Sequence, residues 1–240
     1  MGSDVHGREV VPDPRPAVAR GWRERADPLL AAVVFALYAR TFLFQAFEVP
    51  SASMEKNVLT GDRLLVNKFV FGPGRGPLAG LLPERAVRRG DVLVFRYPED
   101  PRRDFVKRVV ALPGETVEIK DKRVSVDGRT LVEPYAFHSD DQVWPDDPSI
   151  ADEHRRRDQM PPTRVPPGAY FVMGDNRDDS SDSRVWGPVP AGHVEGPALF
   201  VYWSVRPPPS DAPSGLAALV RLPLEIVRRT RWDRTFRAVR

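Results

Sequence analysis

The sequence predicts a mainly β catalytic domain that follows a single N-terminal transmembrane helix. Short runs of β-branched and aromatic residues, separated by Pro and Gly turns, follow one another through residues 48–206. One apolar stretch, residues 28–47, has about the length that crosses a bilayer. At 240 residues, the chain has room for one sizeable domain and its appendages.

The apolar stretch is interpreted as an uncleaved signal anchor. Residues 1–27 are polar, rich in Pro and Arg, and predict a disordered cytoplasmic tail. The arginines in this tail place the N-terminus in the cytoplasm and the rest of the chain outside. A buried helix of a soluble protein is one alternative. A cleaved signal peptide is the other, with cleavage at the small residues 51–53, but such cleavage would destroy the serine motif described below.

The β segments come next, and the domain is expected to span residues 48–206. The expected strands are 62–71, 91–97, 105–112, 116–120, 123–126, 169–173 and 198–203. Residues 133–167 contain seven prolines and predict a long, irregular surface insertion. Residues 207–240 predict a Pro-rich linker and a basic end. This basic end could bind the surface of an anionic membrane, or it could be a solvated tail, and the two alternatives are equally open.

The composition excludes thiol chemistry. There is no cysteine, so disulfides, thiolate catalysis and Cys-ligated zinc are ruled out. The 36 basic residues include five lysines, at positions 56, 68, 107, 120 and 122, and therefore 31 arginines. Lysine loses its proton near neutral pH when it is desolvated, whereas arginine stays charged. Each lysine is therefore a candidate base.

Two hydroxyls occupy an unusual place, in the segment Pro50-Ser51-Ala52-Ser53-Met54 directly after the apolar stretch. A serine hydroxyl is a poor nucleophile until a base takes its proton. Of the four histidines, only His193 lies outside the tail and the insertion, and a surface or capping role suits it better. Lys107 lies inside an apolar strand, where burial would lower its pKa toward neutrality. The alternative for Lys107 is a strand lysine that faces solvent.

Five blocks of the sequence together resemble type I signal peptidases, the membrane proteases that remove signal peptides from exported proteins. The resemblance covers residues from about 27 to 203, and its blocks stand in the order that the family has. The blocks are residues 47–54, 61–68, 89–95, 105–115 and 174–190.

The resemblance implies a role for each residue of a Ser-Lys dyad. Ser53 would be the nucleophile and Lys107 the general base. The Ser51 hydroxyl and the Ser53 backbone N–H would form the oxyanion hole. Ser180 would hydrogen-bond the Lys107 amine. The remaining loop residues, which would brace or shape the loop that carries Ser180, are the ion pair Asp182–Arg184 and the run Asp175, Asn176 and Arg177.

The resemblance also implies the substrate and the setting. Exported preproteins would be cut after small-x-small (Ala-x-Ala) sites by a monomer in the bacterial cell membrane, in contact with lipid, with no cofactor, metal or nucleic acid. Shallow apolar pockets would exclude large side chains by volume. The residues expected to line these pockets are Phe47, Val49, Met54, Phe105 and Val106.

Three alternatives remain open. The acidic, Ser-rich segment 174–184 is also typical of a solvated turn or a calcium site, although its arginines argue against a metal. A self-cleaving repressor-type Ser-Lys protease and a membrane-tethered β module that binds peptides or cell-wall components are the other two. One departure from the family is visible, because Lys56 and Asn57 replace the usual Pro-Thr after the nucleophile block.

Overall fold

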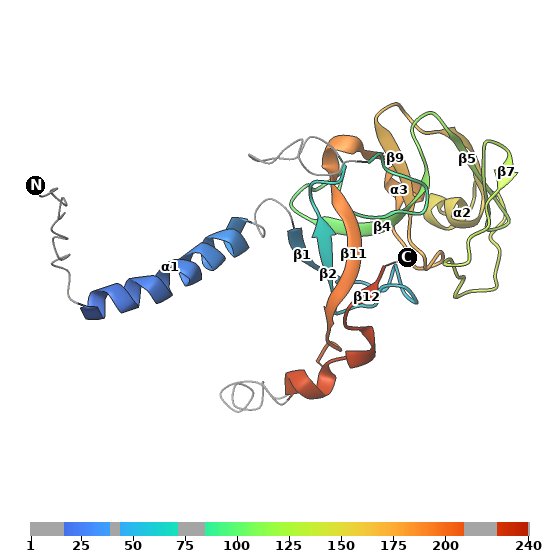
Figure 1. Ribbon diagram of the computed structural model, residues 1–240. Helices are drawn as coiled ribbons and strands as arrows, with labels where there is room; N and C mark the ends of the chain where they lie inside the picture. Colours follow the sequence, from blue (N-terminus) through green and yellow to red (C-terminus); the bar gives the residue numbers. More distant parts are fainter. Residues whose placement is uncertain (1–16, 39–43, 72–84, 209–224, 240) are drawn as a thin grey trace, which may run out of the picture. The chain divides into compact units, whose positions relative to one another are not determined.

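The structure is a computed structural model that describes residues 17–38, 44–71, 85–208 and 225–239 (Figure 1). The chain divides into two compact units, residues 1–41 and residues 42–240. Most of the expected cytoplasmic tail, residues 1–16, lies outside the described residues.

The first unit contains helix α1 (Ala17–Tyr38), which includes Pro28. Large apolar side chains of this helix are exposed, among them Leu29 at 67% and Phe35 at 68%. Within the part of the chain that is described, no helix combines the length and the apolar character needed to cross a membrane. The expected anchor also extends too far, because residues 44–47 lie in a β-strand of the second unit.

The second unit is built on a large antiparallel sheet in the order β1-β2-β11-β3-β4-β9-β10, to which β12 is added beside β11. Its mainly β architecture confirms the fold class predicted for this part of the chain. The strands are β1 (Phe44–Glu48), β2 (Asp62–Asn67), β3 (Val92–Arg96), β4 (Asp104–Ala111), β9 (Ala169–Met173), β10 (Val189–Pro190), β11 (Val194–Ser204) and β12 (Arg237–Ala238).

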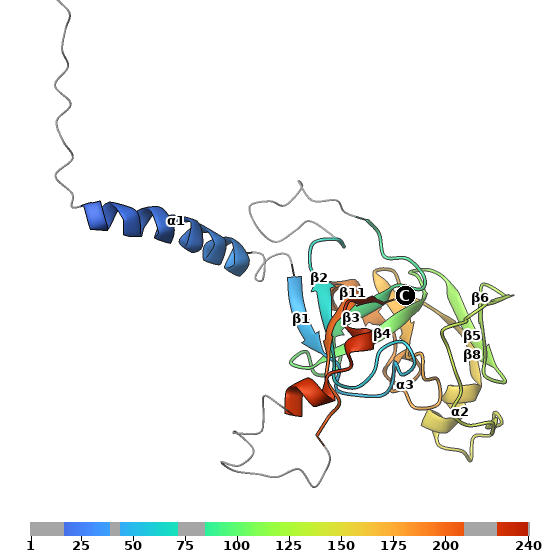
Figure 2. The same cartoon turned by 60° about the horizontal axis from the view of Figure 1, so that its bottom comes forward.

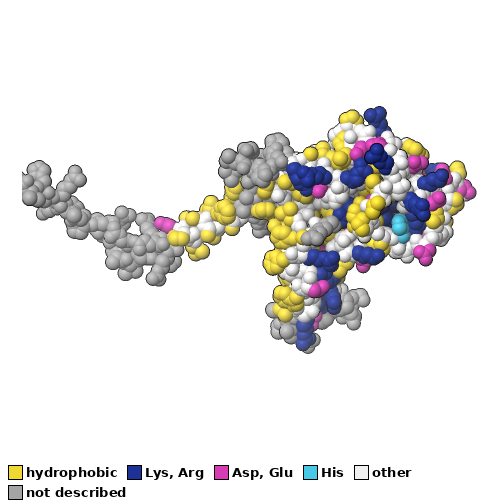
Figure 3. All heavy atoms as spheres, turned by 45° about the vertical axis from the view of Figure 1, so that its right-hand side comes forward, with side chains coloured by type: hydrophobic (Ala, Val, Ile, Leu, Met, Phe, Trp, Pro, Cys, Tyr) yellow, Lys and Arg dark blue, Asp and Glu magenta, His cyan; other side chains and the backbone are white. Residues whose placement is uncertain are grey.

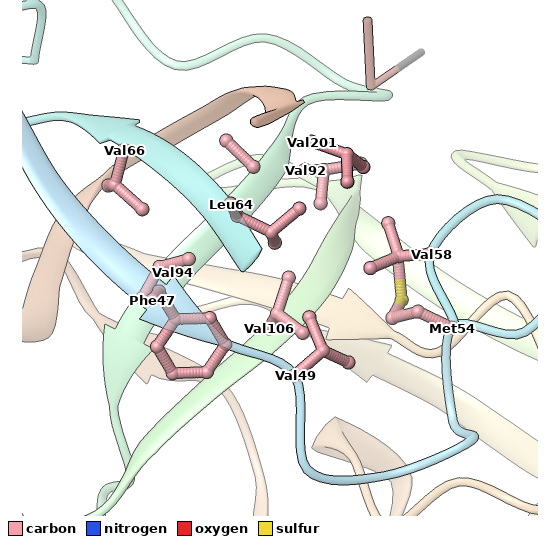
Figure 4. Close-up of a cluster of buried hydrophobic side chains, with 11 residues drawn as sticks. Phe47, Val49, Met54, Val58, Leu64, Val66, Val92, Val94, Val106 and Val201 are labelled. Atoms are coloured by element: carbon pink, nitrogen blue, oxygen red, sulfur yellow. The ribbon is translucent and has the colours of Figure 1, made fainter. Parts of the chain in front are cut away.

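Strand β1 replaces the end of the expected helix because it pairs residue for residue with β2. Phe47 lies opposite Leu64 in this pairing. The Phe47 side chain is only 8% exposed and belongs to a core cluster with Leu64 and Val94 (Figure 4). Burial of an aromatic side chain in a sheet therefore outweighs the continuation of apolar sequence from the helix.

Strand β11 joins the two halves of the large sheet and is the longest strand in Figure 1. Its first residues pair with β3 and its later residues with β2, and the register shifts between Val194 and Gly196 and again farther along. At Gly196 a Cβ atom would lie 1.9 Å from the Asn67 carbonyl oxygen, so only glycine allows this close approach.

A second, four-stranded sheet has the order β7-β6-β5-β8 and lies beside helix α2 in Figure 2. Its strands are β5 (Thr116–Lys120), β6 (Arg123–Val126), β7 (Arg129–Thr130) and β8 (Met160–Arg164), and α2 spans Asp152–Asp158. The prediction of an irregular insertion at 133–167 is therefore wrong for α2 and β8, while residues 133–151 contain no helix or strand. Strand β8 pairs with β5, buries Met160, and holds its two prolines at a sheet edge, where a missing N–H is tolerated.

The C-terminal residues 225–239 fold against the large sheet, where the sequence predicted a linker and a basic tail. Helix η3 (Trp232–Arg234) is followed by β12, which pairs with Phe200 and Val201. Arg234 is buried, and its Nη2 lies 2.6 Å from Asp62 Oδ2. Residues 209–224, which include most of the expected linker, lie outside the described residues.

Candidate active site

Ser53 lies in the turns that connect β1 and β2, and backbone hydrogen bonds fix its position. The Glu55 N–H donates to the Ala52 carbonyl at 2.9 Å, and the Asn176 N–H donates to the Ser53 carbonyl at 3.1 Å. Gly174 also packs here, since a Cβ atom on it would lie 2.5 Å from the Ser53 carbonyl oxygen. The loop that begins at residue 174 therefore holds the Ser53 backbone from outside its own turn.

Lys107 lies in the middle of β4, opposite Leu93 of β3, and its side chain is buried. Its Nζ is hydrogen-bonded to Ser53 Oγ. Burial lowers the pKa of Lys107 from 10.5 to about 8, because the charged amine is desolvated. A buried amine that loses its proton near neutrality, in contact with a serine hydroxyl, can act as the base of an acyl-transfer reaction.

Among the acidic groups, Asp182 has the largest effect on the pKa of Lys107, and it is itself fully buried. Burial alone would raise the pKa of Asp182. The charge and hydrogen bonds of Arg184 outweigh that effect and hold the pKa below its usual value. Arg184 Nε donates to Asp182 Oδ1 and Nη2 to Oδ2, both at 2.8 Å. Asp182 raises the pKa of Lys107 and Arg184 lowers it, but both effects are smaller than that of burial, so the pKa of the amine stays lowered.

The structure differs from the expectation at Ser180. Its hydroxyl donates to Asp182 Oδ2 at 2.7 Å, and it makes no hydrogen bond to Lys107 in the described structure. The carboxylate is the stronger acceptor, which explains this choice. Ser180 remains next to the site, because its Oγ would lie 2.3 Å from a Cβ atom on Gly174.

A cavity of about 390 Å³ opens over the Ser53–Lys107 pair. Phe105 and Val106 are among its lining residues, as predicted, and Ser51 lines it with its Oγ 3.3 Å from Ser53 Oγ. Pro50 and Ala52 complete its apolar wall, whereas Arg103, Asp104, Asp179 and Ser181 supply its polar edges.

The prediction of pocket-lining residues is wrong for the other three side chains. Phe47, Val49 and Met54 do not line this cavity and lie buried in one core cluster, where they point toward other apolar side chains (Figure 4). The reason is that the segment from β1 to the nucleophile turn packs its apolar side chains inward. The chain presents the small residues Pro50 and Ala52 to the cavity instead.

Asp175 and Arg177 anchor the loop with ion pairs. Arg108 Nε and Nη2 each lie 2.7 Å from a different oxygen of Asp175, and this pair is buried. Arg177 pairs with Glu133 at 2.7 Å. The sequence indicated that Asp175 and Arg177 shape the loop, but it did not identify Arg108 as a partner. The only available signal was the position of Arg108 in an apolar strand.

The departure at Lys56 and Asn57 has a structural counterpart. Lys56 adopts φ of 78°, a conformation that proline cannot reach. Asn57 Nδ2 donates to Asp175 Oδ2 at 2.7 Å and therefore links the nucleophile turn to the Arg108–Asp175 pair. A proline at position 56 would therefore require a different backbone conformation in this turn.

The three histidines among the described residues lie away from Ser53 and Lys107. The His193 Nδ1 is 3.2 Å from the Arg96 carbonyl oxygen, His138 contacts Asp178, and His154 packs on Trp144. None of them lines the cavity over Ser53. Among the described residues, no group of three or more His, Asp or Glu side chains is arranged to hold a metal ion.

The family model, the curated relatives and the solved structure that match this chain are all signal peptidases. Residues 22–203 match the family described as signal peptidase, peptidase S26. Signal peptidase I of Pseudomonas aeruginosa is 35% identical over 232 residues, covering 83% of this chain and 80% of that protein. Signal peptidase I of Aquifex aeolicus is 30% identical over 231 residues, covering 78% and 86% respectively. A crystal structure of a signal peptidase I from Enterococcus faecalis is 32% identical with a TM-score of 0.36, covering 47% of this chain and 97% of that one.

Proposed function

This chain belongs to the signal peptidase family S26, and we propose that it cleaves exported preproteins with Ser53 as nucleophile and Lys107 as general base. As a signal peptidase I it is a serine endopeptidase that acts on signal peptides. The observation that carries the proposed mechanism is the hydrogen bond between the buried Lys107 amine and the Ser53 hydroxyl.

In the first step, neutral Lys107 takes the proton of Ser53 Oγ while this oxygen attacks the scissile carbonyl. Negative charge develops on the carbonyl oxygen. The Ser51 hydroxyl, 3.3 Å from Ser53 Oγ, and the Ser53 backbone N–H are proposed to donate to it. The protonated Lys107 then gives its proton to the departing amine, and the signal peptide remains bound to Ser53 as an ester.

The second step repeats this chemistry with water. Lys107, neutral again, takes a proton from a water molecule that attacks the ester. The tetrahedral intermediate collapses and returns the proton to Ser53 Oγ, which releases the signal peptide with a free carboxylate. One base thus serves both steps. The low pKa of Lys107, about 8, supports this dual role, because both protonation states are accessible near neutral pH.

Specificity for small residues before the cut is proposed to come from the walls of the cavity. Phe105, Val106, Pro50 and Ala52 all line a space of about 390 Å³ that Ser53 and Lys107 also line. A long side chain would have to displace one of these walls, so exclusion works by volume.

Attachment to a bilayer is proposed for the first unit. The support is the set of apolar side chains that α1 exposes to solvent, which includes Leu29, Leu30, Val33, Val34 and Phe35. The arginines that precede them favour a cytoplasmic N-terminus and an extracytoplasmic β domain. We propose that the enzyme acts there as a monomer that contacts lipid.

The experiment is cleavage of a preprotein with an Ala-x-Ala site by the full chain in detergent. Wild type is compared with Ser53→Ala, Lys107→Met and the exposed control Lys120→Met. The proposal expects cleavage after the second Ala by wild type and by the control, and none by the two site variants. Cleavage that survives Lys107→Met, or that depends on His193, would overturn the assignment.

A further inference from the structure

A second cavity, of about 350 Å³, lies next to the one over Ser53 and shares two lining residues with it, Asp179 and Ser181. Its far side is formed by Glu153 and His154 of α2 and by Val185 of α3 (Ser183–Trp186). The proposed function gives this second space no role.

The charges that face the second cavity are not balanced. Two arginines line it, but Arg184 is bound to Asp182, and Arg157 Nε lies 2.9 Å from the buried Asp158. The exposed side chains of Glu153 and Asp179 have no ion-pair partner among the described residues. Figure 3 shows basic and acidic side chains interspersed over one face of the second unit.

The two residues shared by the cavities, Asp179 and Ser181, indicate where a bound peptide continues after the cleavage site. Phe105, Val106 and Ala52 form the apolar part of the first cavity, which suits the small residues before the cut. A peptide that crosses Ser53 continues on the other side of the scissile bond. The polar rim of Asp179 and Ser181 leads from the first cavity into the second.

We propose that the second cavity binds a lysine or arginine side chain in the first few residues after the cleavage site of the preprotein. This inference rests on the proposed function. It assigns substrate recognition to Glu153, a residue of the insertion 133–167, together with Asp179. An exposed carboxylate that meets a cation gains about 0.5–1 kcal/mol, so the preference for a cation is expected to be about two- to fivefold in kcat/KM.

The test uses preproteins that share one Ala-x-Ala site and differ only at one position after the cut. Lys, Gln or Glu is placed in turn at the second, third, fourth and fifth positions, and kcat/KM is measured with the full chain in detergent. Asp179 also raises the pKa of Lys107, so its replacement changes kcat/KM for every substrate. The ratio of kcat/KM between substrates is therefore compared within each variant. The variants are Glu153→Gln, Glu153→Lys and Asp179→Asn. The matched control is Asp141→Asn, an exposed acid that lines neither cavity.

The proposal expects wild type and Asp141→Asn to prefer Lys over Glu at one or two of these positions, and the preference to weaken at high salt. Glu153→Gln and Asp179→Asn should reduce it, and Glu153→Lys should invert it. Ser53-dependent cleavage at equal rates for all substrates, or a Lys preference that survives Glu153→Lys, would overturn the subsite and leave the proposed function intact. Absence of cleavage by folded wild type would overturn both.

Discussion

Replacing Lys107 by Met should abolish cleavage and, at neutral pH, stabilise the folded chain. Below about pH 8 the amine is protonated in the folded and unfolded chains alike, and the folded chain bears the cost of burying a charge. The pKa falls from 10.5 to about 8, which at about 1.4 kcal/mol per pH unit corresponds to about 3 kcal/mol. Methionine fills a similar volume and carries no charge.

The sign of the pH dependence follows from the same values. Between about pH 8 and 10.5 the folded amine is neutral while the unfolded amine still binds a proton, so the wild type gains stability as the pH rises. The difference between Lys107→Met and wild type should therefore be largest, up to about 3 kcal/mol, at pH 7 and should approach zero near pH 10.5.

The assay is urea unfolding of the full chain in one detergent, followed by tryptophan fluorescence at several pH values between 7 and 10.5. Exposed Lys120 provides the matched control, since Lys120→Met removes a lysine without removing a buried charge. A Lys107→Met variant that is less stable than wild type at pH 7, with a difference that does not change with pH, would refute the reasoning. The amine would then not be desolvated, and its choice as base would lose its physical basis.

Three further predictions concern the site. The kcat/KM of wild type should rise about tenfold per pH unit at low pH and level off above the pKa of Lys107, about 8; a flat profile between pH 6 and 9 would contradict a lysine base. Ser51→Ala should lower kcat by about 10²–10³-fold, because it removes a donor of the oxyanion hole, and should leave the urea midpoint unchanged. An unchanged kcat would exclude this role for Ser51. Gly174→Ala should cost about 1–3 kcal/mol and reduce cleavage, because its Cβ would lie 2.3 Å from Ser180 Oγ. Gly192→Ala is the control, because a Cβ there would meet nothing within 4 Å. Equal urea midpoints for the two variants would show that the loop at residue 174 accommodates the extra methyl group without loss of stability.

The sequence was a good guide to the strands and to the proximity of Ser53 and Lys107. Strand β4 lies between β3 and β9, so both of its edges are hydrogen-bonded, and its side chains from Val106 to Ala111 are buried on both faces of the sheet. Alternation suggested a buried face for Lys107, but it carried no signal that Arg108 on the opposite face would be buried as well. Five blocks of the sequence together resembled a known family, and this resemblance, more than periodicity, predicted that Ser53 and Lys107 act as a pair.

The parts that sequence reasoning missed depend on distant pairing. Arg234 lies 172 residues after Asp62, and its buried ion pair with that side chain folds the C-terminal segment back onto the sheet. No local pattern marks such a contact. Strand β8 was missed because its two prolines are typical of a loop, and only an edge position beside β5 makes them compatible with a strand. Phe105 and Val106 line the cavity as predicted, whereas Phe47 and Met54 pack inward and the small residues Pro50 and Ala52 line the wall instead.

Two adjacent cations on β4 show how the fold treats lysine and arginine differently. Arg108 cannot lose its proton, so its burial requires a carboxylate, and Asp175 supplies two short hydrogen bonds. Lys107 can become neutral, and among the described residues no carboxylate is hydrogen-bonded to it, because the nearby Asp182 binds Arg184 instead. A carboxylate bound to Lys107 would raise its pKa and keep the amine charged. The Asp182–Arg184 pair thus serves a chemical purpose as well as bracing the loop, since it leaves the buried lysine free to give up its proton.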